Sequence, residues 1–342
     1  MIKKSISLVA ILLISMTTGA LQVMAQKQDR VGKLLKLLSE NETEKFQKGR
    51  EKLDEKTIQA FAAEVELMDI MCHLWTQPDN KSVADYYPTY AKAVKGSLPA
   101  ICNENEIDFA PLRERTNKVI TEVLNTTQDK LTLSRQLIEG AKSSKYPISQ
   151  AQMDLFYLTR EDALMKDCEE KNNAGKYENY FNEFPEGKYL VKLMNEYNQL
   201  LYDNVKRTPT HTNFKNFFDN ITLNRYFNGM SGRKYTPEVR DLYDDYLFSM
   251  IQQAGAPVSK KQCISDYENA SYLEEGQRKY ISALEYIKDS VDYELMKPEV
   301  NSNSKLRLVR DFLTTHKYRE FRDKAQDLCK QFEDSVMHCF LD

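Results

Sequence analysis

The chain has 342 residues, with 48 Lys and Arg against 51 Asp and Glu and a formal net charge of −3 at pH 7. This near-balance lacks the basic excess typical of nucleic-acid-binding proteins, so we expect no nucleic-acid partner. The length is sufficient for one large domain or for two lobes. Only 11 glycines are present, which leaves little material for the glycine-rich loops that hold phosphates, and we predict no cofactor.

The first 25 residues have the pattern of a secretory signal peptide. Two lysines near the start precede an apolar stretch at 6–14, and Ala25 stands before the expected cleavage point. The apolar stretch is much shorter than the roughly 20 residues of a membrane-spanning helix, and no other stretch is apolar enough. We therefore predict a signal peptide over 1–25 and a mature chain over 26–342, located in the periplasm or outside the cell. Loss of the two lysines gives the mature chain a formal charge of −5.

Beyond this segment, apolar residues recur at steps of three and four along almost the whole chain. Ile58, Phe61, Val65, Met68 and Cys72 are one example of this spacing, which is typical of amphipathic α-helices. No comparable stretch alternates strictly between apolar and polar residues, so we predict no strand. The pattern predicts helices near 28–48, 54–76, 83–96, 109–143, 150–172, 174–182, 187–206, 211–228, 237–254, 260–268, 272–296, 304–315 and 317–340.

Local signals support several of these boundaries. In a capping box, a serine hydroxyl and an amide or carboxylate three residues later satisfy free backbone N–H groups at a helix start. Ser149 with Gln152, Ser259 with Gln262 and Ser271 with Glu274 have this spacing. Within 109–143, Asn125-Thr126-Thr127 are poor helix formers, so we expect a break there.

Together these elements predict an all-α fold, an array of antiparallel helix pairs joined by short turns. Such pairs form either a bundle or an α-solenoid. Residues 26–342 then form one helical domain or two lobes, with the most obvious joints at 144–149 and 206–213.

One segment favours the solenoid. Its sequence is Tyr177-Glu-Asn-Tyr180-Phe181-Asn-Glu-Phe184-Pro185-Glu-Gly187-Lys188-Tyr189. A helix that ends in an aromatic residue and proline, followed by a small residue with Lys-Tyr at the next helix start, resembles the turn of tetratricopeptide-like helical-repeat proteins of the bacterial envelope. A looser version without the proline ends at His316-Lys317-Tyr318. The resemblance implies a tetratricopeptide-like or irregular α-solenoid, although no fixed period of roughly 34 residues fits the chain.

Catalytic and metal-binding patterns are sparse. The four histidines form no His-Glu-x-x-His motif, and the sequence has no Gly-x-Ser-x-Gly and no Cys-x-x-Cys. Cys72-His73 and His338-Cys339 could supply four zinc ligands in principle. Neighbouring residues on a helix point roughly 100° apart, however, so neither pair chelates one ion easily. We therefore predict no metal site and no catalytic residue.

The six cysteines leave two interpretations open. An even number in an exported chain is compatible with disulfides, whose pairing the sequence does not determine. Several of them lie on apolar helical stripes, where a free thiol packs as a small hydrophobic group. The six are Cys72, Cys102, Cys168, Cys263, Cys329 and Cys339.

The aromatic content is high, with 20 tyrosines and 15 phenylalanines but one tryptophan. Many of these residues fall on helical stripes and would pack between helices. Tyrosine also suits a binding surface, because its ring packs while its hydroxyl stays in water. We therefore expect a non-catalytic binding or scaffolding module whose helical groove recognises a protein or peptide partner. The candidate contact residues are Tyr177, Tyr180, Tyr189, Tyr243 and Tyr246.

Two further interpretations stay open. The second is a secreted protein that binds a small ligand or a glycan in an aromatic-lined pocket, and the third is an unrecognised enzyme. A deep cavity with a few convergent polar groups would favour the second interpretation. Histidines or carboxylates gathered in one cavity would favour the third. The oligomeric state has no signature in the sequence.

Overall fold

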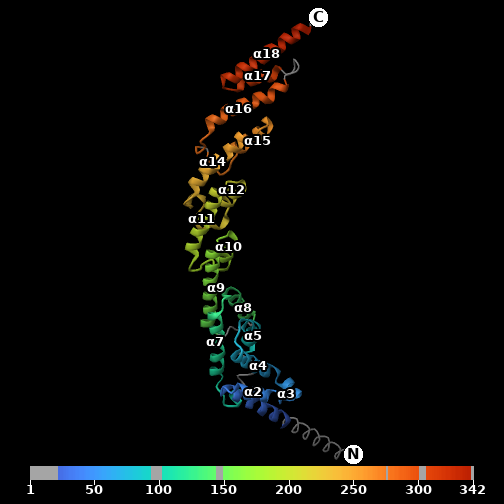
Figure 1. Ribbon diagram of the computed structural model, residues 1–342, viewed down its shortest axis with the longest axis vertical. Coiled ribbons are helices and arrows are strands. Elements are labelled where there is room, and N and C mark those ends of the chain that lie inside the picture. The colour runs from blue at the N-terminus through green and yellow to red at the C-terminus, as the bar shows by residue number, and fades with distance from the viewer. Residues whose placement is uncertain (1–21, 94–101, 144–148, 275, 300–305, 340–342) are drawn as a thin grey trace, which may run out of the picture. The chain divides into compact units, whose positions relative to one another are not determined.

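The computed structural model describes residues 22–93, 102–143, 149–274, 276–299 and 306–339, with side chains described as far as Gln331. Within these ranges every regular element is an α-helix or a short 3-10 helix, and no strand is present (Figure 1). The predicted all-α fold is therefore confirmed. The predicted signal peptide falls mainly on 1–21, which lie outside the described residues.

The chain divides into two compact units. Unit 1 contains residues 1–171 and 179–187, and unit 2 contains 172–178 and 188–342. The helix α10 (Ala174–Glu183) therefore contributes residues to both units. Of the two joints expected from the sequence, 144–148 lie outside the described residues, and 206–213 forms a turn inside unit 2.

Unit 1 is a bundle of helices around one apolar core. Tyr87 and Phe156 meet edge to face there, with ring centroids 5.5 Å apart, which joins α5 to α9. The Trp75 indole N–H donates to the Thr116 hydroxyl at 3.0 Å and joins α4 to α7. The helices are a segment over 22–39, α2 (Thr43–Arg50), α3 (Glu55–Ala60), α4 (Ala62–Thr76), α5 (Asn80–Ala93), α7 (Phe109–Thr126), α8 (Lys130–Ser143) and α9 (Gln150–Lys171).

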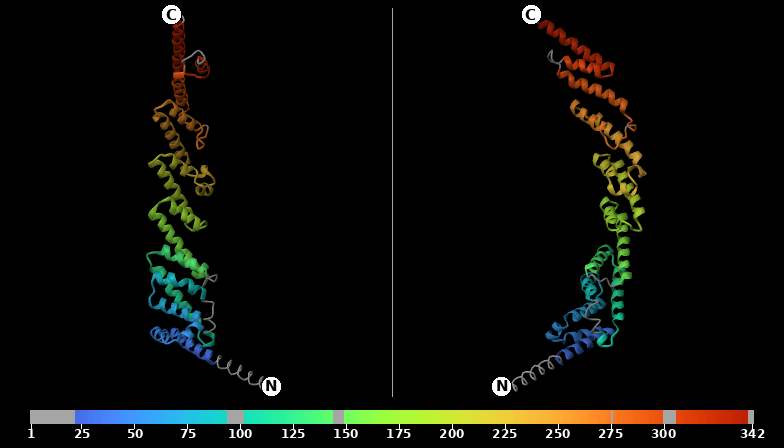
Figure 2. Two further views of the ribbon diagram at one scale, coloured as in Figure 1. Left: turned by 90° about the vertical axis from the view of Figure 1, so that its right-hand side faces the viewer. Right: turned by 180° about the vertical axis from the view of Figure 1, so that it is seen from behind.

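Unit 2 alternates long helices with shorter ones. Successive elements such as α14, α15 and α16 lie side by side (Figures 1 and 2). The elements are α11 (Leu190–Arg207), α12 (His211–Phe218), α13 (Ile221–Tyr226), η1 (Met230–Gly232), α14 (Thr236–Gln253), α15 (Pro257–Glu268), α16 (Ile281–Met296), η2 (Lys297–Glu299), α17 (Leu306–Thr315) and α18 (Arg319–Cys339).

Most predicted helices are present, but several are divided. The break expected at 125–127 is confirmed, because α7 ends at Thr126 and α8 begins at Lys130. The helix predicted over 28–48 is interrupted at Asn41, whose φ of 62° is left-handed, a conformation that asparagine tolerates. The helix predicted over 54–76 is interrupted at Phe61, where φ is −128° and ψ is 39°. The helix predicted over 211–228 is divided, and the Asn220 side chain accepts from the Leu223 N–H at 2.9 Å to start the second part.

None of the three predicted capping boxes forms in full. Ser259 lies inside α15, which begins two residues earlier at Pro257. The Gln152 N–H donates to the Ser149 hydroxyl at 3.2 Å, and α9 begins at Gln150 as predicted. The Gln152 side chain, however, is buried without a hydrogen-bond partner, so only one half of this capping box forms. The prediction of a helix from 272 is wrong, because α16 begins only at Ile281. The intervening segment is held as a turn, since Leu273 is buried and the Arg278 guanidinium donates to the Glu268 carbonyl at 3.0 Å.

The long helices of unit 2 begin in the same way. A Lys-Tyr pair precedes each of α11, α14, α16 and α18, and its tyrosine is the last residue before the helix. The tyrosines before the first three have nearly the same backbone conformation, with φ and ψ of −98° and 3°, −96° and 0°, and −106° and 17°. The spacings between successive tyrosines are 46, 45 and 38 residues. This variation explains why no fixed period fits the sequence. The tyrosines are Tyr189, Tyr235, Tyr280 and Tyr318.

A buried polar side chain of each long helix holds the start of the next one. It stands nine residues after the tyrosine, as Asn198 in α11, Asp244 in α14 and Asp289 in α16, and all three are buried. Asn198 accepts from the guanidinium of Arg233 at 2.9 Å, and Arg233 directly precedes a Lys-Tyr pair. Asp244 accepts from the Lys279 N–H at 2.8 Å. A buried polar group needs such a partner, so this contact fixes where each pair of helices meets the next.

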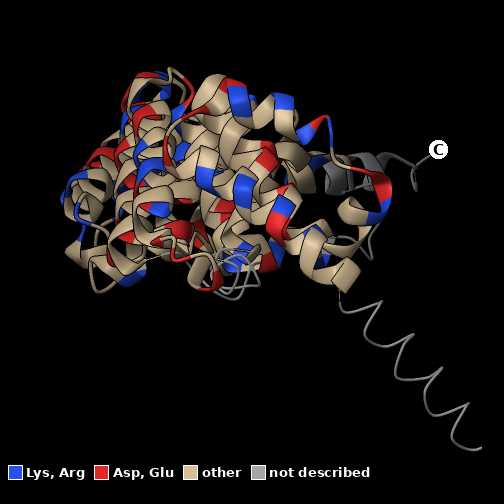
Figure 3. Cartoon of the chain, turned by 90° about the horizontal axis from the view of Figure 1, so that it is seen from below, with Lys and Arg blue, Asp and Glu red and all other residues tan. Residues whose placement is uncertain are grey.

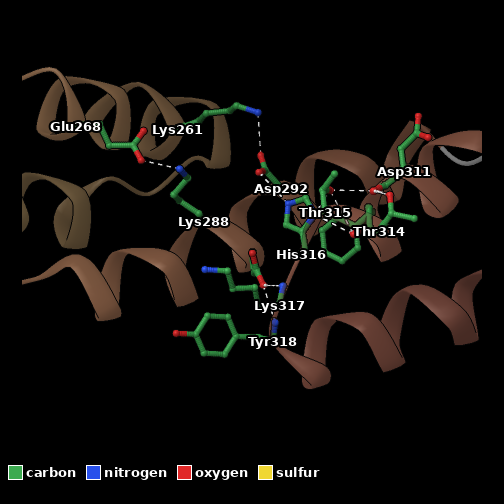
Figure 4. Close-up of polar contacts among 12 residues, drawn as sticks. Lys261, Glu268, Lys288, Asp292, Asp311, Thr314, Thr315, His316, Lys317 and Tyr318 are labelled. Carbon is green, nitrogen blue, oxygen red and sulfur yellow. Dashed lines mark hydrogen bonds and ion pairs between the residues drawn. The ribbon is translucent and has the colours of Figure 1, made fainter.

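Asp289 makes the same contact with the last Lys-Tyr pair. Its Oδ2 atom accepts from the N–H groups of Lys317 and Tyr318 at 2.9 and 2.8 Å. Nearby, the Asp292 carboxylate binds the Lys261 ammonium at 2.8 Å and the His316 imidazole at 3.1 Å (Figure 4). These contacts join α15, α16 and the residues just before α18.

The ring of the capping tyrosine stacks in parallel on a ring of the preceding long helix in two of these junctions. Tyr235 stacks on Tyr202 with centroids 4.3 Å apart, and Tyr280 stacks on Phe248 at 4.1 Å. Both partner rings stand thirteen residues after the previous capping tyrosine. The ring of Tyr318 also packs on the preceding long helix, but it meets Tyr286 of α16 edge to face at 5.2 Å, and its hydroxyl donates to the Ser282 carbonyl at 3.2 Å.

Candidate functional site

A pocket of about 390 Å³ opens on unit 2 and is lined by residues of α12, α14 and α15. Figure 1 labels these three helices. All the residues that line it come from these three helices and from the segment just after α15. The lining residues are His211, Tyr243, Tyr246, Leu247, Met250, Cys263, Asp266, Asn269, Ala270, Ser271 and Tyr272.

Two hollows of unit 1 are larger but less defined as binding sites. One of about 450 Å³ lies between α8 and α9, and charged side chains such as Lys166 and Glu170, which pair at 3.6 Å, form much of its lining. The other, of about 640 Å³, is lined by Ala93 and Ser143, which adjoin segments outside the described residues. The pocket of unit 2 is therefore the better candidate, because its lining is completely described and mainly aromatic and apolar.

The tyrosines that line this pocket pack against two buried phenylalanines, and together they form a cluster of rings from three elements. On α12, Phe214 and Phe218 are four residues apart and face the same way, toward α14. Phe214 lies 4.9 Å from the ring of Tyr243 and 5.2 Å from that of Tyr246. Phe218 stacks on Tyr272 at 4.4 Å. The rings hold one another in place, so their faces are fixed before any ligand arrives.

The polar groups of the pocket come mainly from the end of α15. Asp266 is exposed, and its carboxylate accepts from the Gln262 amide at 2.9 Å. The Asn269 amide donates back to the Ser265 carbonyl at 2.8 Å. A helix C-terminus carries a partial negative charge, so the Asp266 carboxylate and the helix end both make this side of the pocket negative.

Burial and acidic neighbours both act on the tyrosine hydroxyls. Burial, followed by a hydrogen bond to Asp219, raises the pKa of Tyr272 to about 12. Burial, followed by the proximity of Tyr246 and Asp266, raises the pKa of Tyr243 above its ordinary value. These hydroxyls are therefore neutral donors at physiological pH, and the negative charge of the site comes from the carboxylates.

A thiol and an imidazole also line the pocket, but they do not form a catalytic pair. Cys263 is half-buried and His211 is exposed. Within the described residues, no hydrogen bond joins His211 to Cys263 or to Asp266. A cysteine nucleophile needs a neighbouring base within hydrogen-bonding reach, and this geometry does not supply one.

The five tyrosines predicted from the sequence are separated by the fold. Tyr177 is 2% exposed and Tyr180 is fully buried, so neither side chain can contact a partner. Tyr177 stacks on Tyr197 at 5.4 Å, and the Tyr180 hydroxyl donates to Glu161 at 2.7 Å. Both are core residues, because they lie on the inner face of α10.

The other three predicted tyrosines have different environments. Tyr189 is half-buried at the start of α11, with the Lys188 ammonium 4.8 Å from its ring centroid. Tyr243 and Tyr246 both line the pocket, with ring centroids 6.4 Å apart. The structure thus brings together only this pair, which is one helical turn apart on α14.

Two components of the site were missed in the sequence. Tyr272 was assigned to a helix, although it belongs to the turn after α15, and Asp266 was not singled out at all. The signal for Tyr272 was Asn269-Ala-Ser271, a short run of turn-forming residues directly before it.

The cysteines and histidines of the remaining sequence motifs lie elsewhere. Cys72 and Cys102 are buried free thiols, and burial raises the pKa of Cys102 to about 11. The His73 imidazole bonds to the Ser82 hydroxyl at 3.1 Å. The side chains of His338 and Cys339 lie outside the described residues. Among the described side chains, no group of three or more His, Cys, Asp and Glu could hold a metal ion.

The surface carries both signs of charge, with Lys and Arg interspersed among Asp and Glu along the helices (Figure 3). No helix in the described part of the chain is long and apolar enough to cross a membrane. Comparisons with known proteins found no family model that matches this chain, no similar curated protein and no similar solved structure.

Proposed function

We propose that this protein is an exported, non-catalytic binding or scaffolding module that recognises a protein or peptide partner. We further propose that unit 2 is an irregular, tetratricopeptide-like array of helix pairs, whose pocket between α12, α14 and α15 receives one side chain of an extended peptide. The observation that carries this proposal is the aromatic pocket itself, because its rings are fixed by one another and its mouth is open.

The recurring helix junctions support the repeat assignment. Each long helix of unit 2 holds the start of the next one through a buried side chain at the same distance from the Lys-Tyr pair. Repeated junctions of this kind let helix pairs stack in a line, with each pair contacting only its neighbours. Such arrays present extended surfaces, on which peptides commonly bind.

A secreted binder of a small ligand or a glycan is the second candidate, because a volume of about 390 Å³ lies within the range of small-molecule sites. An enzyme is the third, since His211, Cys263 and Asp266 share the pocket lining although they are not hydrogen-bonded to one another. The three candidates differ in what binds and whether it is transformed.

A peptide selection tests the first candidate. Random peptides displayed on phage are selected against the full chain, and the affinity of each enriched sequence is measured by fluorescence anisotropy. The blocking variant is Met250→Trp, since Met250 is 41% exposed and lines the pocket. The control is Val258→Trp, because Val258 is 69% exposed on α15 and is not a lining residue.

We expect the Met250→Trp variant to lose affinity for the selected peptides by about tenfold or more, and the Val258→Trp variant to keep it. Failure to select any peptide, or equal binding by the two variants, would contradict peptide recognition by this pocket. Glycan or small-ligand binding that only the Met250→Trp substitution blocks would establish the second candidate instead.

A further inference from the structure

We propose that the pocket between α12, α14 and α15 recognises a basic side chain, the guanidinium of arginine or the ammonium of lysine, on the bound peptide. This inference rests on the proposed function of peptide recognition and adds the chemical class of the recognised residue. Three separate features of the pocket favour a cation over a neutral or acidic group.

The first feature is the set of exposed ring faces. A cation within about 6 Å of an aromatic centroid is attracted by the negative face of the ring. Elsewhere in unit 2 the chain fills such positions itself, since the Arg233 guanidinium lies 3.9 Å from the Phe217 centroid and the Lys206 ammonium lies 5.1 Å from that of Tyr202. Tyr243 is buried among other rings, but Tyr246 and Tyr272 are half-buried in the pocket lining. Among the described residues, no cation of the chain lies over either of these two rings, so a cation from outside can approach them.

The second feature is unbalanced negative charge. Nearby acidic residues of unit 2 form ion pairs within the chain. The Glu268 carboxylate pairs with the Lys288 ammonium at 2.6 Å, and the Asp245 carboxylate pairs with the Lys279 ammonium at 3.2 Å. In the described part of the chain, Asp266 accepts only from the neutral Gln262 amide, and neither Asp266 nor Asp219 forms an ion pair. The lining contains no lysine and no arginine. An incoming cation would therefore meet carboxylates that have no counter-charge.

The third feature is the end of α15. The helix ends at Glu268, and Asn269, Ala270 and Ser271 of the lining follow it directly. The last carbonyl groups of a helix carry a partial negative charge that favours cations. Arg278 donates to the Glu268 and Ala270 carbonyls from outside the lining and offsets part of this charge, so Asp266 contributes more of the negative charge of the pocket than the helix end does.

These features also argue against the alternatives. A carboxylate or phosphate ligand would be repelled by Asp266 and by the helix end. A purely apolar side chain would fill the space between the rings but would leave the carboxylates without a partner. A basic side chain has an apolar stem for the rings and a charged head for Asp266, and it satisfies both parts of the pocket.

Four fluorescent Gly-Ser peptides of about nine residues, with a central arginine, lysine, norleucine or glutamate, provide the test. Norleucine is the matched control, because it keeps the apolar stem and removes the charge. Anisotropy is measured with the full chain and with the variants Asp266→Asn, Tyr246→Leu and Tyr246→Phe. The control variant is Glu294→Gln, which removes an exposed acid of α16 away from the pocket. Circular dichroism confirms that each variant is folded.

We expect the arginine and lysine peptides to bind at least about tenfold more tightly than the norleucine peptide, and the glutamate peptide not to bind. The Asp266→Asn and Tyr246→Leu variants should each bind the arginine peptide about threefold or more less tightly than the parent protein does. The Tyr246→Phe variant keeps the ring face and should bind like the parent protein, as should Glu294→Gln. Added salt should weaken binding of the arginine and lysine peptides more than binding of the norleucine peptide.

Equal affinity for the arginine and norleucine peptides would overturn the basic-residue inference but leave peptide recognition intact, provided that the phage selection yields peptides that Met250→Trp excludes. Tight binding of free butylguanidinium, with no gain from the peptide around it, would overturn the peptide as the source of the cation. Protection of Cys263 from alkylation by the arginine peptide alone would support binding inside the pocket, because this thiol lines it. Equal protection by all four peptides would count against it.

Discussion

The Oδ2 atom of Asp244, on α14, accepts a hydrogen bond of 2.8 Å from the backbone N–H of Lys279, just before α16. Asp244 is buried, so its removal leaves this N–H without its partner at the junction of two helix pairs. We expect Asp244→Ala to lower the free energy of unfolding of unit 2 by about 1–3 kcal/mol. Asp244→Asn keeps the acceptor and should cost less. Hydrogen exchange followed by mass spectrometry should show faster exchange at 279–285 in the alanine variant.

The matched control is Asp241→Asn, which lies on the same helix but is exposed, with its carboxylate 3.6 Å from the Lys279 ammonium. An exposed ion pair contributes about 0–1 kcal/mol, so this variant should exchange like the parent protein. Equal effects of Asp241→Asn and Asp244→Ala would mean that the buried contact does not hold the junction.

The stability of the junction before α18 should depend on pH. Burial alone raises the pKa of Asp292, but the hydrogen bonds from Lys261 and His316 outweigh it and lower this pKa below its ordinary value (Figure 4). A carboxylate with a lowered folded-state pKa stabilises the fold above its unfolded pKa of about 3.9, and this contribution is lost as the pH falls through the lower folded-state value. We expect the melting temperature to fall below about pH 4 in the parent protein.

The Asp292→Asn variant should melt at a lower temperature near neutral pH and should lose part of this acid dependence. The difference between the two proteins should therefore shrink as the pH is lowered from about 6 to 2.5. A constant difference over that range would show that Asp292 does not contribute through its charge. Exposed Glu294→Gln again serves as the control, because its carboxylate lies on the same helix.

Arg233 is 1% exposed and, among the described residues, has no carboxylate partner. Its guanidinium instead donates to the Asn198 side chain, the Phe217 carbonyl and the Asn224 side chain, and burial lowers its pKa to about 10. We expect Arg233→Met to destabilise unit 2 by about 2–4 kcal/mol in urea unfolding, because these acceptors lose their donor. Arg233→Lys should be nearly as costly, since one ammonium cannot reach three separate acceptors. Full stability of the lysine variant would contradict this account.

The amphipathic spacing was sufficient to predict the helical fold, because burial of one face is a local property of the sequence. The helix junctions were harder to recognise. Only the Lys-Tyr pairs at 188–189 and 317–318 were noticed, since those at 234–235 and 279–280 follow turns of different length. Their common role depends on Asn198, Asp244 and Asp289, which look like ordinary polar residues until the next helix packs on them.

The residues of the candidate site were equally hard to predict from the sequence alone. Tyr177 and Tyr246 are both tyrosines on amphipathic helices, and their spacing does not reveal that the first is buried and the second lines a pocket. The difference arises from what covers each ring. Tyr177 stacks on Tyr197 of α11 inside the core, whereas Tyr246 contacts Phe214 of α12 and lines the pocket. Tyr272 could not be assigned at all, because its place depends on the Phe218 ring that it stacks on.

The cysteines should differ in reactivity. Cys263 is half-buried in the pocket lining, whereas Cys72 and Cys102 are buried and their thiol pKa values are raised by burial. Since the thiolate is the reactive form, we expect iodoacetamide at about pH 8 to modify Cys263 at least tenfold faster than the other two in the native protein. Peptide mass spectrometry after brief labelling gives the three rates. Rapid modification of Cys102 would contradict its buried position.

The same assay separates the binding proposal from the enzymatic one. If His211 were a base for Cys263, its replacement in His211→Ala would slow alkylation strongly, because the thiolate would lose the neighbour that stabilises it. No hydrogen bond joins the two side chains in the described structure, so we expect the rate in His211→Ala to stay within about twofold of that in the parent protein. Asp266→Asn gives a second comparison, since it removes the only carboxylate among the lining residues. A large loss of alkylation rate in either variant would show that the replaced group activates the Cys263 thiol, and it would favour an enzyme over a binding module.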